Sequence, residues 1–229
     1  MDIINEAMRI FTDAGIGDAV RVTLAMALAS VTISALLGIA LGILLEQCHF
    51  PGKRILIRIN HTLLGIPPVV VGLLVYLLLM RNGPLGAFAL LFTIKGMVLA
   101  QIIIITPIIT SMVYSYAFTT APAVRAFAVT MGASKWQTQI LTIKEMKYEI
   151  YFAIVTGFGR AISEVGSVML VGGNIEGRTR TMTTAISMLK SQGIYTEGVT
   201  LGVLLLVFAF ILQWAAESFQ KRELENENY

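Results

Sequence analysis

Residues 22–45 read VTLAMALASVTISALLGIALGILL, and none of these 24 side chains carries a charge. At about 1.5 Å per residue, a helix of this length crosses the roughly 30 Å hydrocarbon core of a bilayer. Four further apolar stretches follow at residues 63–80, 96–118, 150–172 and 199–216. We therefore predict an all-α protein, a polytopic bundle of about five transmembrane helices. These helices form a single transmembrane domain that covers residues 1–229.

The composition points the same way. Of 229 residues, 56% are hydrophobic and 14% are charged, whereas soluble domains carry about 25% charged residues. The single cysteine, Cys48, excludes an internal disulfide and a cysteine-based metal centre. The net charge is only +3 and no basic cluster alternates with aromatics, so we expect no nucleic-acid partner, no metal and no cofactor, only the lipid bilayer around the helices.

Orientation follows from the distribution of Lys and Arg, which favours cytoplasmic loops. With the N-terminus outside, nine of these residues fall on inner segments and seven on outer ones. We therefore predict a multi-pass protein of the cell membrane with its N-terminus outside and its C-terminus in the cytoplasm. The longest loop, residues 119–149, then faces the cytoplasm.

The fourth stretch contains an acid and a base four residues apart, Arg160 and Glu164, which fall on one helical face. Charges at bilayer depth are costly and face a partner or a water-filled path. Two interpretations stay open, a local ion pair and a gate or translocation path. Small residues accompany the charges, and the candidates for the path are Gly159, Arg160, Ser163, Glu164, Gly166 and Ser167.

Gly172, Gly173 and Asn174 predict the end of that helix, because Gly and Asn accept the left-handed conformation that closes a helix. A basic, hydroxyl-rich loop comes next. Arg178, Arg180 and Thr183 are candidates for attracting an oxyanion at the outer mouth of a pore. A loop that is merely solvated is the alternative.

Enzymatic chemistry has no support in the sequence. The phosphate-binding pattern G-x-x-x-x-G-K-[ST] does not occur, and no spacing suggests a nucleophile with its base. We predict that the chain is not an enzyme and that no residue is catalytic.

Several motifs resemble those of a known family. The run AFAVTMGAS at 126–134, followed by Lys135 and Trp136, resembles the cytoplasmic coupling loop of ABC-importer permeases, although the usual Glu is Ala126. FPGK at 50–53 and GRAISEVG at 159–166 are similar to the molybdate, sulfate and tungstate branch. VGGNI at 171–175 with TRTMTTAI at 179–186 looks most like the tungstate permeases.

The resemblance implies a type I importer fold, similar to the molybdate and methionine permeases, and a role as the membrane conduit of an ATP-driven oxyanion importer. Its partners would be two ABC ATPase subunits, an extracytoplasmic oxyanion-binding protein and a second copy of the chain. The residues implied in ATPase coupling are Ala126, Ala128, Gly132, Ala133, Ser134, Lys135 and Trp136. Tungstate leads molybdate and sulfate as substrate, and a secondary transporter coupled through Arg160 and Glu164, or a structural membrane adaptor, remains as an alternative class.

Overall fold

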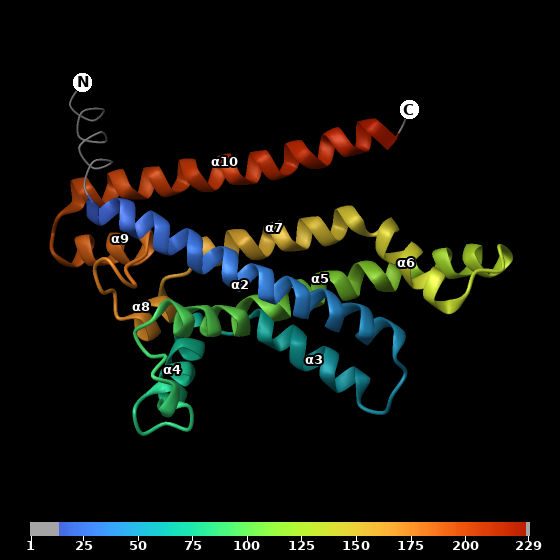
Figure 1. Cartoon of the computed structure of the whole chain (residues 1–229), viewed down its shortest axis with the longest axis horizontal. Coiled ribbons are helices and arrows are strands. Elements are labelled where there is room, and N and C mark those ends of the chain that lie inside the picture. Colours follow the sequence, from blue (N-terminus) through green and yellow to red (C-terminus); the bar gives the residue numbers. More distant parts are fainter. Residues whose placement is uncertain (1–13, 228–229) are drawn as a thin grey trace. The chain divides into compact units, whose positions relative to one another are not determined.

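The computed structural model describes residues 14–227, and these residues are helical with no strand among them (Figure 1). The helices are α2 (Ala14–Gln47), α3 (Lys53–Leu64), α4 (Pro68–Leu79), the 3₁₀ turn η1 (Gly86–Phe88), α5 (Ile94–Thr130), α6 (Lys135–Glu145), α7 (Lys147–Ser163), α8 (Gly166–Gly172), α9 (Met182–Ser191) and α10 (Tyr195–Glu227). The prediction of an all-α chain is confirmed.

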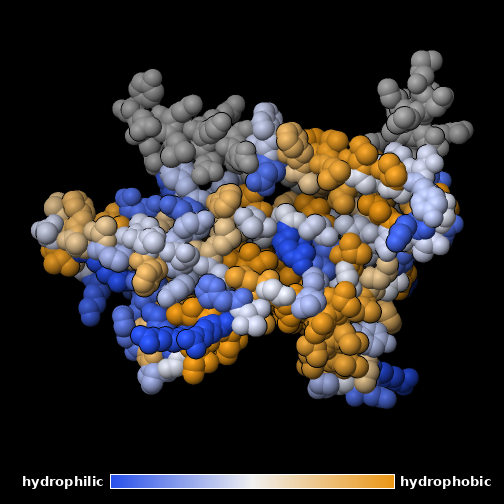
Figure 2. Space-filling model, turned by 180° about the vertical axis from the view of Figure 1, so that it is seen from behind, coloured by the Kyte–Doolittle hydropathy of each residue, from blue (hydrophilic) through white to orange (hydrophobic). Residues whose placement is uncertain are grey.

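Two helices among the described residues are long and apolar enough to cross a membrane, α2 from Gly15 and α5. Two pairs, α3 with α4 and α7 with α8, qualify as broken spans, and α10 contributes a shorter apolar stretch, Tyr195–Ile211. Hydrophobic side chains cover broad areas of the visible surface (Figure 2). The protein is thus a membrane protein with at least two spanning helices, and the total of five stays a prediction.

The chain forms two compact units. Among the described residues, the first unit contains residues 14–30, 67–103 and 158–227, and the second contains residues 31–66 and 104–157.

In the first unit, α4 and α8 lie side by side because glycines bring their backbones together (Figure 1). A Cβ on Gly72 would lie 2.6 Å from Ser167 Cα, and a Cβ on Gly166 would lie 2.6 Å from Val69 Cγ2. Small residues allow this close approach, which helices in lipid use in place of a hydrophobic driving force. A buried cluster lies beside them, formed by Val22, Met26, Met97, Val98 and Val168.

In the second unit, α2 and α5 pack through glycines in the same way. A Cβ on Gly38 would lie 2.8 Å from Ile109 Cβ, and one on Gly42 would lie 2.8 Å from Val113 Cβ. Moving four residues forward on α2, from Gly38 to Gly42, moves the contact four residues forward on α5, from Ile109 to Val113. The two helices therefore run parallel. The small residues Gly38 and Gly42, one turn apart on α2, thus serve helix packing here.

Helix α5 extends well past the predicted limit of residue 118 and ends at Thr130, although Pro107 and Pro122 lie inside it. Each proline removes only one N–H donor from the helix, and this loss does not end α5. The first third of the predicted loop 119–149 is therefore helix.

The stretch 150–172 is also not one helix. It is broken after Ser163, and α8 continues at 59° to α7. The stretch 63–80 is not one helix either, because it contains the last two residues of α3, the break at Gly65–Pro67 and the 12 residues of α4.

Candidate functional site

The break between α7 and α8 holds the acid and base that the sequence indicated. Glu164 is only 3% exposed, and its Oε2 lies 3.0 Å from Arg160 Nη2. Its other oxygen, Oε1, accepts a hydrogen bond of 3.1 Å from the Ser167 backbone N–H. That N–H belongs to the first turn of α8 and has no partner within the helix. The Glu164 carboxylate therefore joins the end of α7 to the start of α8.

Other side chains satisfy the carbonyls that the break leaves without helical partners. Gln101 Nε2 donates to the Ala161 carbonyl at 2.9 Å, and Thr183 Oγ1 donates to the Glu164 carbonyl at 2.8 Å. Gln101 Oε1 accepts from Ser30 Oγ at 2.7 Å. Because unpaired backbone groups are expensive in a bilayer, irregular backbone persists there only when protein groups complete it. Each of these donors thus stabilises the broken helix.

The break also changes the geometry of the path candidates. In a continuous helix Gly159, Ser163 and Ser167, which are spaced four residues apart, would lie on one face, but α7 ends at Ser163. Gly159 and Ser163 are exposed, whereas Ser167 is buried against Gly72. The structure does not bring these three residues together on one surface, because α8 turns away from the axis of α7.

The loop after α8 ends the helix as predicted. Gly173 has a φ of 70° and Asn174 a φ of 51°, both in the left-handed region. Thr179 Oγ1 donates to the Gly172 carbonyl and accepts from the Ile175 N–H, and these bonds hold the loop closed.

The three outer-loop candidates have different surroundings. Arg178 is exposed, and Arg180 is largely covered and lies 3.1 Å from Glu176. Thr183 is 6% exposed in the first turn of α9, so its hydroxyl serves the Glu164 carbonyl and does not face solvent. Only Arg178 lies openly on the surface.

The turn between α5 and α6 holds the coupling-loop candidates, all within the second unit. Gly132 has a φ of 69°, and Ser134 caps α6 in a reciprocal pair of bonds with Gln137. Residues Lys135–Glu145 form the short helix α6 that follows this turn. Lys135 and Trp136 form its first turn, and Ala133 precedes the cap. Ala126 is exposed and Ala128 is buried near the end of α5.

Large apolar side chains surround this turn without cover. The exposed fractions are 59% for Phe127, 74% for Val129, 71% for Met131 and 70% for Trp136. Hydrophobic atoms reach the surface at the left edge of Figure 2, which corresponds to the α5–α6 turn at the right of Figure 1. Such a patch marks a site for lipid or protein contact.

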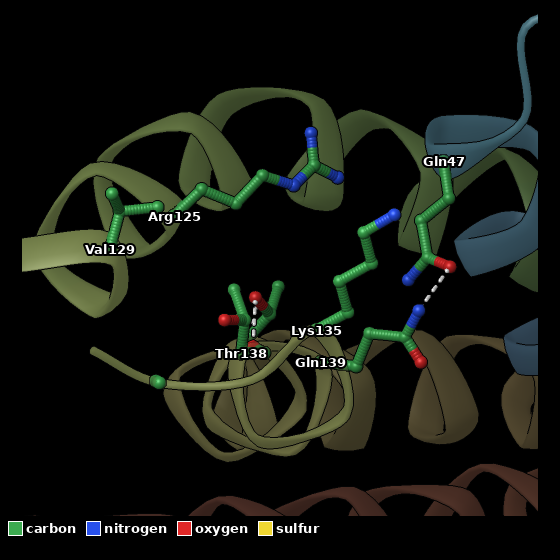
Figure 3. A pocket seen from close by; sticks show the side chains of 8 residues that line it. Gln47, Arg125, Val129, Lys135, Thr138 and Gln139 are labelled. Carbon is green, nitrogen blue, oxygen red and sulfur yellow. Dashed lines mark hydrogen bonds between the residues drawn. The ribbon is translucent and has the colours of Figure 1, made fainter. Parts of the chain in front are cut away.

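A cavity of about 340 Å³ opens beside this turn (Figure 3). Its lining combines two cations with hydroxyl and amide groups: Gln47, Arg125, Val129, Ala133, Lys135, Thr138, Gln139 and Thr142. Arg125 forms an ion pair with the buried Glu46, and Gln139 Nε2 donates to Gln47 Oε1 at 3.0 Å. These bonds tie α6 and the end of α5 to the end of α2.

Sequence reasoning missed Gln101 and Thr183 as structural donors. A single amide in the uncharged run 96–118 was the available indication, because a buried amide in lipid requires partners. The identity of those partners was not predictable, since Ala161 is 60 residues away along the chain.

Comparisons with known proteins agree in every case on transport. Residues 34–224 match the family described as "Binding-protein-dependent transport system inner membrane component". The tungstate uptake system permease protein TupB of Peptoclostridium acidaminophilum is 41% identical over 189 residues, which cover 82% of this chain and 83% of the relative. A probable anion ABC transporter permease protein of Haloferax volcanii is 37% identical over 88% of this chain and 89% of its own.

A more distant relative is the sulfate transport system permease protein CysW of Escherichia coli K12, 28% identical over 92% of this chain and 77% of the relative. Among solved structures, a bacterial ABC transporter for import of the acidic polysaccharide alginate has a TM-score of 0.76 at 19% identity and covers 94% of this chain and 82% of its own. The likeness supports the importer-permease fold. The family match extends over most of the chain, and the chain therefore belongs to the family of binding-protein-dependent transport system inner membrane components.

Proposed function

We propose that this chain is the permease subunit of an ATP-driven oxyanion importer and that its substrate is tungstate. The observation that carries the proposal is the 41% identity to a tungstate uptake permease over more than four fifths of both chains. A second tungstate permease, from Campylobacter jejuni, is 34% identical over 76% of this chain. Membership of a binding-protein-dependent family favours this class over a secondary transporter or a structural adaptor.

The proposed importer needs an ATP-hydrolysing subunit, and this sequence contains no motif for one. No G-x-x-x-x-G-K-[ST] loop occurs among the 229 residues, so we assign ATP hydrolysis to a separate ABC ATPase in two copies. We further assign an extracytoplasmic oxyanion-binding protein and a second copy of the chain. Support for the binding protein comes from the solved alginate transporter, which was captured with an alginate pentasaccharide-bound periplasmic protein.

The ATPase contact is assigned to the turn between α5 and α6. A capped helix follows a left-handed glycine there, and uncovered apolar side chains surround it. Ala126, Ala128 and residues 132–136 are the coupling residues in this proposal. The turn is then cytoplasmic, which requires the N-terminus outside and the C-terminus inside.

The gate is assigned to the break between α7 and α8. Glu164 links the two helices, and Arg160, which is 33% exposed, is its charged partner. Residues at helix ends and breaks are where hinge motions between two packings take place. Arg178 and Arg180 are proposed to attract the anion from outside.

Reconstitution tests the function. The purified chain, its ATPase and its binding protein are placed in liposomes, and uptake of tungstate, molybdate and sulfate is measured with and without internal ATP. We expect ATP-dependent uptake with tungstate preferred. Preference for molybdate or sulfate would replace the substrate, and uptake without ATPase would contradict the proposal.

A further inference from the structure

Helix α3 carries a basic stripe along one exposed face. The members of the stripe are exposed and recur at i, i+4 and i+7, so they lie on one face of the helix: Arg54, Arg58 and His61. No residue of α3 is buried. The apolar Ile55 and Ile59, 63% and 50% exposed, form a neighbouring face.

A third face of α3 attaches to α5, and all of these residues belong to the second unit. Asn60 Nδ2 donates to Ser111 Oγ at 2.6 Å and to the Pro107 carbonyl at 3.3 Å. Near the start of α3, the Lys53 ammonium lies 5.9 Å from the centre of the Tyr114 ring. Earlier residues of α3 thus meet later residues of α5, so the two helices run antiparallel, as the lower part of Figure 1 shows.

These contacts fix the depth of α3 in the membrane. Pro107 and Ser111 lie in the middle of the uncharged run of α5 between Lys95 and Arg125. At about 1.5 Å per residue, Pro107 is about 18 Å from Lys95 and Ser111 is about 21 Å from Arg125. Arg58 lies two residues, or about 3 Å, from Asn60 along α3. Arg58 is therefore near the middle of a hydrocarbon core about 30 Å thick, and Arg54, about 9 Å from Asn60, lies nearer the level of Arg125.

Neither guanidinium of the stripe has a hydrogen bond or ion pair among residues 14–227. Arg54 and Arg58 also stand four residues apart, where like charges repel each other. Charges at this depth face a bundle interior or a water-filled cavity and not the lipid. The stripe thus has no negatively charged partner among these residues. The centre of a bilayer does not supply one either, because it holds only lipid tails.

We propose that Arg54 and Arg58 bind the transported oxyanion in transit, with His61 as a further hydrogen-bond donor about one turn further along α3. The inference rests on the proposed function and adds residues to it. A tetrahedral divalent oxyanion offers edges that match the guanidinium fork, and two such forks one turn apart neutralise its charge.

An anionic phospholipid headgroup offers similar oxygen atoms, but headgroups lie at the surface of the bilayer. Asn60 holds Arg58 about 20 Å from either charged end of α5, which is beyond the reach of an arginine side chain. Arg54 lies about 9 Å from Asn60 on the side of Arg125, so the depth argument applies to Arg58. The depth therefore favours a small anion in a water-filled path.

Thiol labelling tests where the stripe faces, independently of transport. In a Cys48→Ser background, Arg58→Cys and Ile59→Cys are compared in membrane vesicles that contain the assembled transporter. A charged, water-soluble thiol reagent reacts with a thiolate, which forms only in water. We expect Arg58→Cys to react at least about ten times faster than Ile59→Cys. Slow reaction of both would place the stripe in lipid or protein, and fast reaction of both would place α3 outside the membrane; either result overturns the proposal.

Uptake measurements then test the anion. Arg54→Gln combined with Arg58→Gln is expected to lower tungstate uptake at least about tenfold, a factor typical of a lost charge-assisted hydrogen bond. ATP hydrolysis stimulated by the loaded binding protein should persist. The double Lys variant should restore part of the uptake, and Lys190→Gln, which removes an exposed charge on α9, should match the wild type.

Unchanged uptake in the double Gln variant overturns the proposal. If the wild type imports no oxyanion, the proposed function fails, and the labelling ratio still decides which environment the stripe faces.

Discussion

Gln101 shows how one uncharged side chain stabilises several helices in a membrane. Its amide accepts from Ser30 on α2 and donates to the Ala161 carbonyl on α7, and it is itself 1% exposed on α5. Both partners are buried, so no water replaces a lost bond.

We predict that Gln101→Leu lowers stability by about 1–2 kcal/mol, the range of interhelical hydrogen bonds in lipid. For a chain of this size, the loss corresponds to a fall in melting temperature of about 2–8 °C. The measurement is thermal unfolding in one detergent at one scan rate. Thr119→Val is the matched control, because Thr119 is exposed and bonds only to carbonyls of its own helix. Equal melting temperatures for the two variants would contradict the role of Gln101.

Glu164 permits a finer test, since its two oxygens have different partners. Glu164→Gln keeps an oxygen for the Ser167 N–H and loses the charge pair with Arg160, whereas Glu164→Leu loses both. We predict that the Leu variant is less stable than the Gln variant by about 0.5–2 kcal/mol, the usual contribution of a helix cap.

Uptake by Arg160→Gln/Glu164→Gln in liposomes separates gating from stability. Normal uptake at normal expression would leave the pair with a structural role only.

The ion pair was predictable at this scale, and the rest of its surroundings was not. Arg160 and Glu164 are four residues apart, a spacing that local helix geometry determines. Thr183 reaches the Glu164 carbonyl from 19 residues away and only because the helix breaks. No local pattern in GRAISEVG required a break, because its residues also suit a continuous helix.

At the scale of elements, the contact between α4 and α8 depends on the absence of a side chain. We predict that Gly72→Ala destabilises the protein by about 1–3 kcal/mol, since the added Cβ would lie 2.6 Å from the Ser167 Cα and the helices must separate. Gly202→Ala in α10 is the matched control, because nothing lies within 4 Å of its Cβ position. There the change should be neutral or stabilising by up to about 1 kcal/mol. Thermal unfolding of both variants under one condition decides the point.

The turn between α5 and α6 depends on conformation and not on space. Nothing lies within 4 Å of a Cβ on Gly132, but its φ of 69° costs other residues about 1–2 kcal/mol. We predict that Gly132→Val lowers the tungstate imported per ATP hydrolysed, while Gly132→Asn retains it, because Asn tolerates the left-handed region. Uptake and phosphate release are measured in the same liposomes. A Val variant with normal coupling would exclude a functional role for the turn geometry.

Hydropathy predicted most of the long helices. It failed where a polar segment of the chain is nevertheless helical. The run at 119–130 carries threonines and a proline, so it resembled a loop, yet α5 continues through it. Residues 53–62 carry three cations, so hydropathy does not mark them as a span, yet they lie in α3. In both places helix formation depends on packing against neighbours, which composition does not reveal.

For the whole molecule, the orientation in the membrane determines on which side the α5–α6 turn lies. We predict that a cysteine introduced by Ser134→Cys in the Cys48→Ser background reacts with an impermeant reagent only from the cytoplasmic side. The same background with Arg178→Cys should react only from outside. Intact cells and inside-out vesicles supply the two measurements. Reversed accessibility would contradict the assigned orientation and, with it, the assignment of the α5–α6 turn to the ATPase.

The interlocking of α2 and α5 at Gly38 and Gly42 limits how transport can occur. Each glycine fits against one isoleucine or valine with no spare volume, so sliding by one residue would force a methyl group into a neighbouring backbone. Within the second unit, α2 and α5 must therefore move together as one rigid pair. Under the proposed function, a movement imposed on the α5–α6 turn would shift this part of α2 and α5 together, and the change of packing would fall to the shorter, broken helices.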